Sequence, residues 1–403
     1  MRRLNPYTSV LIVVVSVTAC DRPSPTSPTD PLASGQSADG FAGPFRLGGP
    51  VGFLSLDQRR LFDRGRVMFT NTFTPATGLG PLFNASSCAE CHGLPVVGGG
   101  GTQVETHMTA FVNGSCDALE AVGGQVVQDS ATPALQALGV FREPPIPGAT
   151  GTGHRTTPSL LGFGLLEAVP DQEILAHADP NDANGDGIRG RASIEPDGRV
   201  DRFGKKDVAP TIDAFLADAF IYEMGITDSA EPDEQTIAGQ PLPPGVDPTS
   251  DPEITQDDFR ATVAFVRYLA PPPTAGFGFT DRQGRLLFSR VGCAACHTPA
   301  LFTAGDAPRP LANRVVFAYS DLLLHDMGPQ LADICLGNAT PAEFRTEPLM
   351  GIRYKVAYLH DGRATSIDQA IQLHGGEASG VVARYLALSP FARATLLRFV
   401  SRL

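Results

Sequence analysis

Apolar residues recur at helical spacing in the stretch that precedes a run of three prolines. Phe259, Val263 and Val266 lie three or four positions apart, so one face of a helix would carry all of them. Thr255 is a suitable N-cap, and the proline run at 271–273 cannot continue a helix. The pattern predicts a helix that starts after Thr255 and stops before the prolines.

A second helical stretch leads into a segment with two cysteines. Leu286, Leu287 and Phe288 form its apolar part, and we expect Thr280 to cap it. The long stretch at 93–154, by contrast, is loop-like in composition, and we expect loops there.

Four short elements occur twice in the same order, which indicates an internal duplication. The first copy comprises 65–69, 88–92, 155–158 and 261–269, and the second comprises 284–288, 293–297, 345–348 and 399–403. The proline run separates the two copies. We therefore expect an N-terminal domain at 48–272 and a C-terminal domain at 273–403.

The composition favours short helices joined by long, ordered loops. The chain has 43 Gly and 35 Pro, and only 18% of its residues are charged. The expected fold class is mainly α and loop-rich, with few short strands. The net charge of -12 argues against nucleic acid and anionic membrane surfaces as partners, and it is compatible with a basic or neutral protein partner.

The N-terminus resembles a bacterial lipoprotein export signal. Two arginines precede an apolar segment at 10–17 that is too short to span a bilayer, and Cys20 follows small residues as in a lipobox. An ordinary cleavage site beside a chance cysteine is the alternative. We expect a signal peptide at 1–20, a flexible tether at 21–47, and a lipid anchor at Cys20 on the periplasmic face of a Gram-negative membrane.

Each copy contains the spacing Cys-x-x-Cys-His, which attaches haem c. Two cysteines at this spacing can form thioethers with both vinyl groups, and the next histidine can bind the iron. A redox dithiol or half a zinc site is the alternative for one motif, but it explains two equivalent motifs poorly. The predicted attachment residues are Cys88, Cys91, Cys293 and Cys296, and the predicted proximal ligands are His92 and His297.

Two further cysteines, Cys116 and Cys335, lie outside these motifs. In an oxidising compartment they could form a disulfide, which would join the two halves of the chain. Two buried thiols are the alternative. Because a sequence supplies no Cα separation, both interpretations stay open at this stage.

The residue on the other side of each iron decides between electron transfer and ligand binding. His374 and His177 lie at similar positions after the third repeated element of their copies. Repeat position therefore favours these two as distal ligands over the other histidines. Met327 and Met350 are the thioether alternatives.

A further segment resembles the first half of a calcium loop. Asp182, Asn184 and Asp186 supply side-chain oxygens at alternating positions before a glycine. The twelfth position is Ser193, so a full EF-hand is excluded. A shorter calcium loop and a solvated turn are the two interpretations.

Several segments resemble the bacterial di-haem oxidoreductase family, whose members are labelled peroxidases or thiol oxidoreductases. These segments are 162–170, 182–187, 320–328 and 359–363. The resemblance runs from about Gly49 to Leu403, and more distantly the chain resembles di-haem cytochrome c peroxidases and the methylamine-dehydrogenase maturation enzyme. It implies two tandem cytochrome c-like domains, with calcium near their interface.

In the peroxidases that the chain resembles, the C-terminal haem receives electrons and the N-terminal haem reduces hydrogen peroxide. The resemblance places His374 at the electron-transfer haem and His154 near the peroxidatic haem. It also favours Glu167, or alternatively Glu173, as the carboxylate that moves protons on bound peroxide. The electron donor would be a small periplasmic cytochrome or cupredoxin.

One departure concerns electron relay, because those peroxidases have a tryptophan between the haems and this chain has none. Tyr319, Tyr354 or Tyr358 could replace it, or the haems could lie close enough to need no relay. The main hypothesis is a peroxidase-like oxidoreductase with two covalent haem c groups, acting on peroxide or another small oxidant. The alternatives are a non-catalytic electron-transfer cytochrome and a haem oxygenase of organic substrates.

Overall fold

The structure is a computed structural model that describes residues 46–273 and 278–403. The predicted signal peptide, the lipid anchor and nearly all of the predicted tether fall within 1–45 and lie outside the described residues. Within the described part of the chain, no helix combines the length and apolar character needed to cross a membrane.

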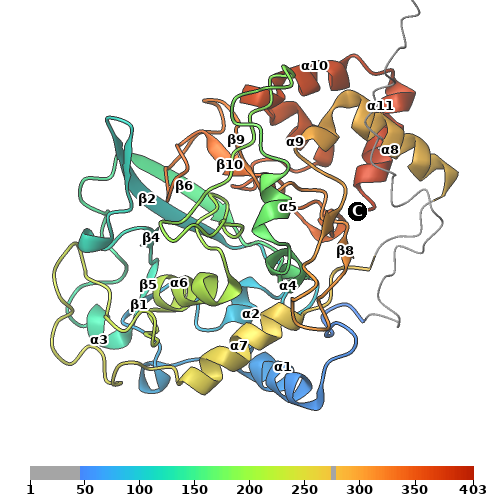
Figure 1. Ribbon diagram of the computed structural model, residues 1–403. Coiled ribbons are helices and arrows are strands. Elements are labelled where there is room, and N and C mark those ends of the chain that lie inside the picture. Colours follow the sequence, from blue (N-terminus) through green and yellow to red (C-terminus); the bar gives the residue numbers. More distant parts are fainter. Residues whose placement is uncertain (1–45, 274–277) are drawn as a thin grey trace, which may run out of the picture. The chain divides into compact units, whose positions relative to one another are not determined.

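Most helices are short, in agreement with the Gly- and Pro-rich composition (Figure 1). The α-helices are α1 (Leu56–Phe69), α2 (Cys88–Cys91), α3 (Pro133–Gln136), α4 (Phe163–Glu167), α5 (Asp171–Leu175), α6 (Ile212–Met224), α7 (Gln256–Tyr268), α8 (Phe279–Val291), α9 (Ile367–Leu373), α10 (Ser379–Leu386) and α11 (Pro390–Val400). The 3-10 helices are η1 (Pro75–Thr77), η2 (Glu120–Val122), η3 (Cys293–Ala295), η4 (Ile352–Tyr354) and η5 (Gly376–Ala378).

Two strands, β2 and β6, are longer than three residues in the part of the chain that the structure describes. They pair antiparallel, with Val104 opposite Thr156, in a sheet of order β3-β2-β4 with β6 beside β2. The strands are β1 (Leu82–Phe83), β2 (Val104–Val112), β3 (Ser115–Asp117), β4 (Val126–Val127), β5 (Ser130–Ala131), β6 (Gly151–Thr156), β7 (Leu301–Phe302), β8 (Val315–Val316), β9 (Leu324–Asp326) and β10 (Glu343–Arg345).

This sheet occupies the segment for which loops were predicted, so that prediction is wrong for part of 93–154. The reason lies in strand β2, where polar residues occupy both faces: Glu105 and His107 on one, Thr106 on the other. Thr106 interrupts the alternation of apolar and polar residues between Val104 and Ala110, which weakens the sequence signal of a half-buried strand.

The start of helix α7 agrees with the sequence pattern, whereas the start of α8 does not. The Thr255 hydroxyl accepts the Asp258 N–H, so Thr255 is the N-cap of α7. Helix α8 begins at Phe279, and its N-cap is Gly278 rather than Thr280. The Asp281 carboxylate accepts the Gly278 N–H at 2.7 Å and satisfies this helix end, which leaves no capping role for Thr280.

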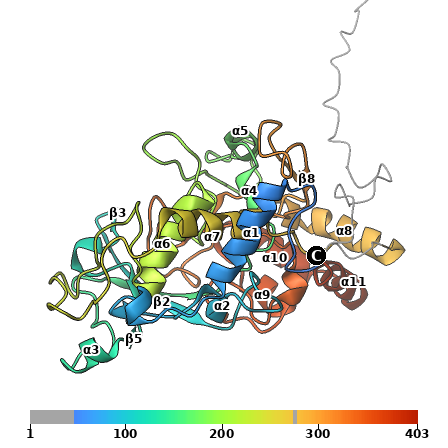
Figure 2. The same ribbon diagram turned by 90° about the horizontal axis from the view of Figure 1, so that it is seen from below.

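Helices α1 and α7 pack against each other in close contact (Figure 2). A Cβ atom on Gly65 of α1 would lie 1.8 Å from the Ala261 carbonyl oxygen, so glycine is required for this approach. Beyond the crossing, the Phe69 ring contacts Phe265 of α7, with centroids 4.9 Å apart. The Phe69 ring also lies 6.1 Å from the imidazole of His92, the predicted proximal ligand.

The same arrangement recurs between α8 and α11. A Cβ atom on Gly284 would lie 2.3 Å from the Phe399 Cβ. The Phe288 ring packs against Phe399 at 5.8 Å and lies 6.4 Å from the His297 imidazole. Gly284, Phe288 and His297 thus repeat the placement of Gly65, Phe69 and His92, as the duplicated sequence predicts.

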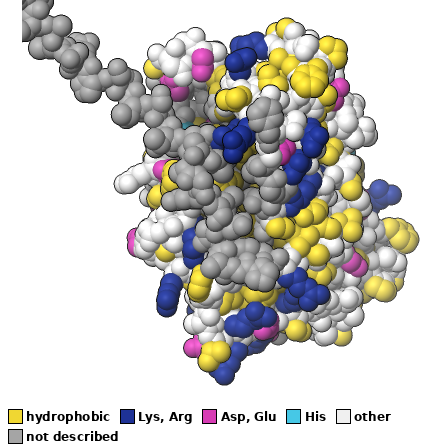
Figure 3. Space-filling model, turned by 90° about the vertical axis from the view of Figure 1, so that its right-hand side faces the viewer, with side chains coloured by type: hydrophobic (Ala, Val, Ile, Leu, Met, Phe, Trp, Pro, Cys, Tyr) yellow, Lys and Arg dark blue, Asp and Glu magenta, His cyan; other side chains and the backbone are white. Residues whose placement is uncertain are grey.

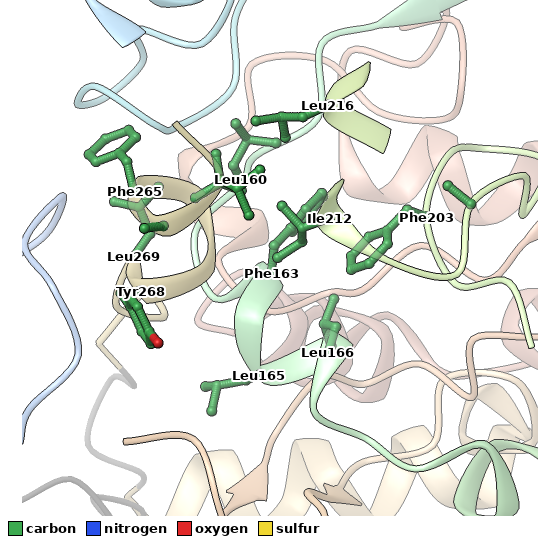
Figure 4. Close-up of a cluster of buried hydrophobic side chains, with 14 of the residues drawn as sticks. Leu160, Phe163, Leu165, Leu166, Phe203, Ile212, Leu216, Phe265, Tyr268 and Leu269 are labelled. Atoms are coloured by element: carbon green, nitrogen blue, oxygen red, sulfur yellow. The ribbon is translucent and has the colours of Figure 1, made fainter. Parts of the chain in front are cut away.

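Buried apolar side chains form a large cluster around α4, α6 and α7 and a second one around α8 and α11. Figure 4 shows part of the first cluster, in which side chains from the three helices converge. Each fully buried Leu or Phe contributes about 2 kcal/mol of transfer free energy. Cys88 of the first motif packs against the first cluster, and Cys293 of the second motif packs against the second cluster.

Cross-links join segments that are far apart in sequence. Cys116 of β3 and Cys335 form a disulfide across 219 residues, with their Cα atoms 5.8 Å apart, which answers the question that the sequence left open. Nearby, the buried Arg155 of β6 makes an ion pair with the buried Asp333. The segment after β9 is thereby fixed to the sheet.

Candidate functional site

The second Cys-x-x-Cys-His motif follows directly from helix α8. Gly292 has φ 103°, which favours glycine, and turns the chain from α8 into η3. The His297 Nδ1 donates to the Tyr319 carbonyl oxygen at 2.9 Å. Burial lowers the pKa of His297 to about 4, so the ring is neutral and its Nε2 lone pair is available for a metal.

A largely apolar cavity, partly open to solvent, lies beside this motif. Cys293, Cys296 and His297 line it, and so do His374 and Met327. The His374 Nδ1 donates to the Ala370 carbonyl oxygen at 2.6 Å, which fixes the ring and leaves Nε2 available. This donor set, two orienting hydrogen bonds and two attachment thiols in an apolar cavity, fits a haem held by His297 with His374 as its second ligand.

Charged residues line one part of the same cavity. The Glu347 carboxylate contacts Lys205 at 3.0 Å, Arg345 at 3.3 Å and Lys355. Burial alone would raise the pKa of Glu347, but these three cations hold it well below its usual range. Lys205, Arg345 and Lys355 are the cations that haem propionates would require at this part of the cavity.

The first motif is a short helix, α2, followed by His92. The His92 Nδ1 lies 3.1 Å from the Gly99 carbonyl oxygen and 3.0 Å from that of Pro158. Burial lowers the pKa of His92 to about 4 and raises the pKa of Cys88 to about 12. The two motif histidines therefore share one state: a neutral ring oriented through Nδ1, with Nε2 available.

Carboxylates that the sequence analysis did not single out lie beside this first motif. The carboxyl groups of Glu105 in β2 and Glu223 at the end of α6 are hydrogen bonded to each other. Burial raises the pKa of the Cys91 thiol, and the charges of these two carboxyl groups raise it further. His107 follows on the same face of β2, with its Nε2 3.6 Å from a Glu105 oxygen. No local motif could have identified this group, because 118 positions separate Glu105 from Glu223.

A buried charged group also lies beside the second motif. His325 contacts Asp321 through Nε2 at 3.0 Å and Glu377 through Nδ1 at 2.9 Å, and its Nδ1 is 3.6 Å from the Cys296 sulfur. Burial would lower the pKa of His325, but these partners raise it well above its usual value. The ring is therefore an imidazolium, balanced by two carboxylates.

The two predicted catalytic residues lie away from the Glu105 group. Both Glu167 oxygens are engaged, since they accept from Arg267 and from the Ile212 N–H at the start of α6. Glu167 thus holds three helices together, and its geometry gives no support to a role in proton transfer. His154 is exposed and pairs with Thr106, so it lies on the opposite face of the sheet from Glu105.

His177 and the predicted calcium loop are at the surface. His177 is exposed just after α5, so the structure does not bring it to a motif as the repeat position suggested. Asp182, Asn184 and Asp186 each accept a backbone N–H of their own loop. In the described residues, the carboxylates close enough to share an ion belong to another group, made of Glu234, Asp247, Asp251 and Glu253.

A protein-family model described as "Di-haem oxidoreductase, putative peroxidase" matches residues 149–403 of the chain. The matched region contains the second motif and His374, whereas the first motif precedes it. Among curated proteins, none is significantly similar in sequence.

Solved structures show only distant similarity. Hydrazine synthase from Kuenenia stuttgartiensis is 14% identical with a TM-score of 0.42, over 98% of this chain and 100% of that chain. A MauG-like protein associated with microbial copper homeostasis is 14% identical with a TM-score of 0.41, over 90% and 94% of the two chains. A diheme peroxidase from Burkholderia thailandensis is 16% identical with a TM-score of 0.39, over 85% and 86%. Similarities of this size do not identify an activity.

Proposed function

Because this chain belongs to the di-haem oxidoreductase family, we propose that it is a peroxidase-like enzyme in which each motif binds one haem c covalently. The observation that carries this proposal is the repeated geometry of the motifs. In both, a histidine with an available Nε2 is oriented by a backbone carbonyl and packed against a phenylalanine of the preceding helix. Two cytochrome c-like domains, at 48–272 and 273–403, are part of the proposal.

The two sites have different surroundings, which supports different roles. Bound haem would supply an iron that exchanges single electrons and can bind a peroxide oxygen. At the C-terminal site, His374 shares the cavity of His297, so two imidazoles are available for one iron. This arrangement suits electron entry. The N-terminal site, with carboxyl groups beside its motif, suits peroxide reduction.

A connection between the sites supports electron transfer from one to the other. Lys355 lines the C-terminal cavity and also a smaller cavity beside the loop at 100–101 that contacts the first motif. Tyr354 lines the smaller cavity and Tyr358 the larger one. Thr156 lines the smaller cavity and His360 the larger one. The Thr156 N–H donates to the His360 carbonyl oxygen at 2.9 Å, so a hydrogen bond joins the two linings. We propose these tyrosines as the relay in place of tryptophan.

A calcium ion at the loop of Asp182, Asn184 and Asp186 remains a proposal. Each of these side chains uses one oxygen for a backbone N–H, and calcium prefers oxygen ligands of these types. Calorimetric titration of calcium into the protein and into the Asp182→Asn/Asp186→Asn variant tests it. Equal binding by both proteins would place any calcium elsewhere.

We also propose export and lipid anchoring at Cys20 on the periplasmic face of a Gram-negative membrane. The disulfide between Cys116 and Cys335 is consistent with an oxidising compartment. The donor would be a small periplasmic cytochrome or cupredoxin, and the oxidant peroxide or another small molecule. Release of the Cys20→Ala protein from the membrane fraction would support the anchor.

A second candidate, a non-catalytic electron carrier, is favoured by the placement of His374 beside His297, since two strong ligands close an iron to substrates. Electron paramagnetic resonance of the oxidised and half-reduced protein, followed by hydrogen peroxide, separates the two functions. A peroxidase should show a high-spin ferric signal at one haem that disappears during turnover. Two low-spin signals that do not respond to peroxide would leave the electron carrier.

A further inference from the structure

Strand β2 directs a row of polar side chains along the first motif. Gln103, just before β2, donates from its side chain to the Glu90 carbonyl oxygen at 2.6 Å, within α2. Because side chains alternate along extended chain, Glu105 and His107 follow Gln103 on the same side. In the register of the sheet, Glu105 lies opposite Arg155. Glu105 is therefore the second residue in a row that begins in contact with the motif.

Helix α6 delivers a second carboxyl group to the same place. The Glu223 carbonyl oxygen accepts the Asn84 N–H at 2.7 Å, and its carboxylate accepts the Asn84 side-chain N–H at 3.0 Å. Asn84 lies four residues before Cys88. Glu223 is thus fixed to the strand that leads into the motif, and it meets Glu105 there.

The electrostatics of this group are those of an acid–base pair. Burial raises the pKa of both carboxyls, and repulsion from Glu105 raises that of Glu223 further. Arg155 and Lys205 act in the opposite direction on Glu105, as His107 and Asn84 do on Glu223. Because burial is the largest of these effects, the pair retains one proton more readily than two separate carboxylates would. Burial lowers the pKa of His107 to about 4, which keeps this imidazole neutral. Neither His107 nitrogen has a hydrogen-bond partner among residues 46–273 and 278–403, although both are buried.

A stabilising role alone does not account for this arrangement. Two acidic groups that meet away from bulk water destabilise the fold, and a buried imidazole without a hydrogen bond adds to that cost. Other buried carboxylates of the chain, such as Asp333 and Glu347, are instead paired with cations. Among the described residues, Glu105 and Glu223 make no direct ion pair with a Lys or Arg, although Arg155 lies opposite Glu105 in the sheet. A carboxyl pair of this kind beside a cofactor-attachment motif is typical of a functional site.

We propose that Glu105 and Glu223 are the proton-transfer pair of the N-terminal site, with His107 as the neutral group that exchanges protons with them. This inference rests on the proposed peroxidase function and replaces Glu167 as the acid–base residue. In the net reaction the O–O bond of hydrogen peroxide breaks, two electrons come from the donor protein, two protons are taken up, and two waters form. The ionised carboxylate takes the proton from one oxygen of hydrogen peroxide. The protonated carboxyl group supplies a proton to the other oxygen, which leaves as water when the O–O bond breaks.

The test compares the holoprotein with its Glu105→Gln and Glu223→Gln variants. Glu143→Gln is the matched control, because Glu143 is a buried carboxyl with a raised pKa that accepts the Gln128 N–H, away from the motif. The first readout is the association rate of cyanide with the half-reduced protein. Hydrogen cyanide must lose its proton when it binds iron, so loss of a base should slow binding by at least about 10-fold. The control should bind as the wild type does.

The second readout is peroxide turnover across pH. We expect each variant to lose about 10²-fold in rate, and we expect the limb of the pH profile that reports the pair to disappear. Haem absorbance and circular dichroism establish that each variant is folded and loaded. If one variant fails to fold, the other carries the test.

The outcomes separate this inference from the proposed function. A wild type that turns over peroxide, with variants that keep both rates, would overturn the pair and leave the peroxidase intact. A wild type that ignores peroxide, but binds cyanide more slowly in the variants, would overturn the peroxidase and leave the pair. An N-terminal haem that binds no cyanide in the half-reduced wild type would contradict both.

Discussion

At the scale of single residues, the histidines of the C-terminal cavity are the clearest indication of iron ligation. His297 and His374 each donate Nδ1–H to a main-chain carbonyl, at 2.9 and 2.6 Å. Burial lowers the pKa of both, so Nε2 carries a lone pair at neutral pH. A histidine of this kind is pre-oriented, and removing it should change the coordination of the iron without unfolding the site.

We therefore expect His374→Ala to convert the C-terminal haem from low spin to high spin. The absorption spectrum and electron paramagnetic resonance of the oxidised holoprotein measure this change. His374→Met is the control, since a thioether should keep the haem six-coordinate and raise its reduction potential. An alanine variant that stays low spin would mean that another side chain, such as Met327, is the ligand.

At this scale, the sequence alone predicts a site only where the chemistry is local. The Cys-x-x-Cys-His spacing identifies Cys293 and His297 because the cofactor itself dictates the interval. Glu105 and Glu223 could not be predicted as a group from sequence, because only the fold brings strand β2 and the end of helix α6 together. Family resemblance favoured Glu167 as the acid–base residue, but in the structure its carboxylate accepts hydrogen bonds from Arg267 and from the first N–H of α6.

At the scale of elements, each motif is preceded by a helix that crosses its partner at a glycine. Gly65 and Gly284 are the points of closest approach in α1–α7 and α8–α11. The next turn of each helix carries the phenylalanine that packs on the proximal histidine. Helix spacing and imidazole position are thus coupled through about one turn of each helix.

Accordingly, Gly65→Ala should destabilise the protein, because the new methyl group would overlap the Ala261 carbonyl oxygen. We expect a loss of about 1–3 kcal/mol in the free energy of unfolding. Urea denaturation of the holoprotein measures it. Arg66→Ala, at an exposed position of the same helix, should change stability by less than about 0.5 kcal/mol. A Gly65→Ala protein as stable as the wild type would show that the helices can separate freely.

The elements divide into those that the sequence predicted and those that it did not. Helix α7 was predictable because an N-cap, an apolar face and a proline stop agree over one segment. The sheet of β2 and β6 was not, because Thr106 interrupts the alternation in β2 and because β6 consists of Gly, Thr, His and Arg. Helix α8 was correctly predicted as a helix, but its N-cap is Gly278, whose N–H donates to the Asp281 carboxylate, and not Thr280.

At the scale of the whole molecule, charge is distributed unevenly. The chain has a net charge of -12, yet α8, α10 and α11 together carry six arginines and one acidic residue, the buried Asp281. Figure 3 shows Lys and Arg side chains among hydrophobic ones on the side of the molecule where α8 and α11 lie in Figure 1. Exposed apolar residues of these helices include Leu286 and Phe391.

These three helices also form a wall of the C-terminal cavity. A basic surface with apolar residues, directly outside the proposed point of electron entry, fits a small donor protein with an acidic face. Net charge alone had pointed to a basic or neutral partner. Local charge governs docking, because charges beyond a Debye length of about 8 Å are screened at physiological salt.

Reversal of charge on this surface should slow reduction by an acidic donor. We expect Arg282→Glu/Arg290→Glu to lower the bimolecular rate by at least about 10-fold at low salt, with the difference shrinking at high salt. Stopped-flow reduction by an acidic cytochrome or cupredoxin measures it. Arg142→Glu, an exposed arginine of the N-terminal half, provides the same type of charge change as a control. Equal rates for all three proteins would exclude this docking surface.

The disulfide between Cys116 and Cys335 has a consequence for how the protein is made. Its second partner is residue 335, so the bond can close only after the first 335 of the 403 residues have been synthesised. Until then, the chain carries all seven of its thiols: the two that pair, the four that we propose attach haem, and Cys20, which we propose is lipidated. Thiolates exchange with any disulfide they reach. Haem attachment at four cysteines and lipidation of Cys20 before oxidation would leave one pairing, so we expect the order of these maturation steps to affect the yield of correctly paired protein.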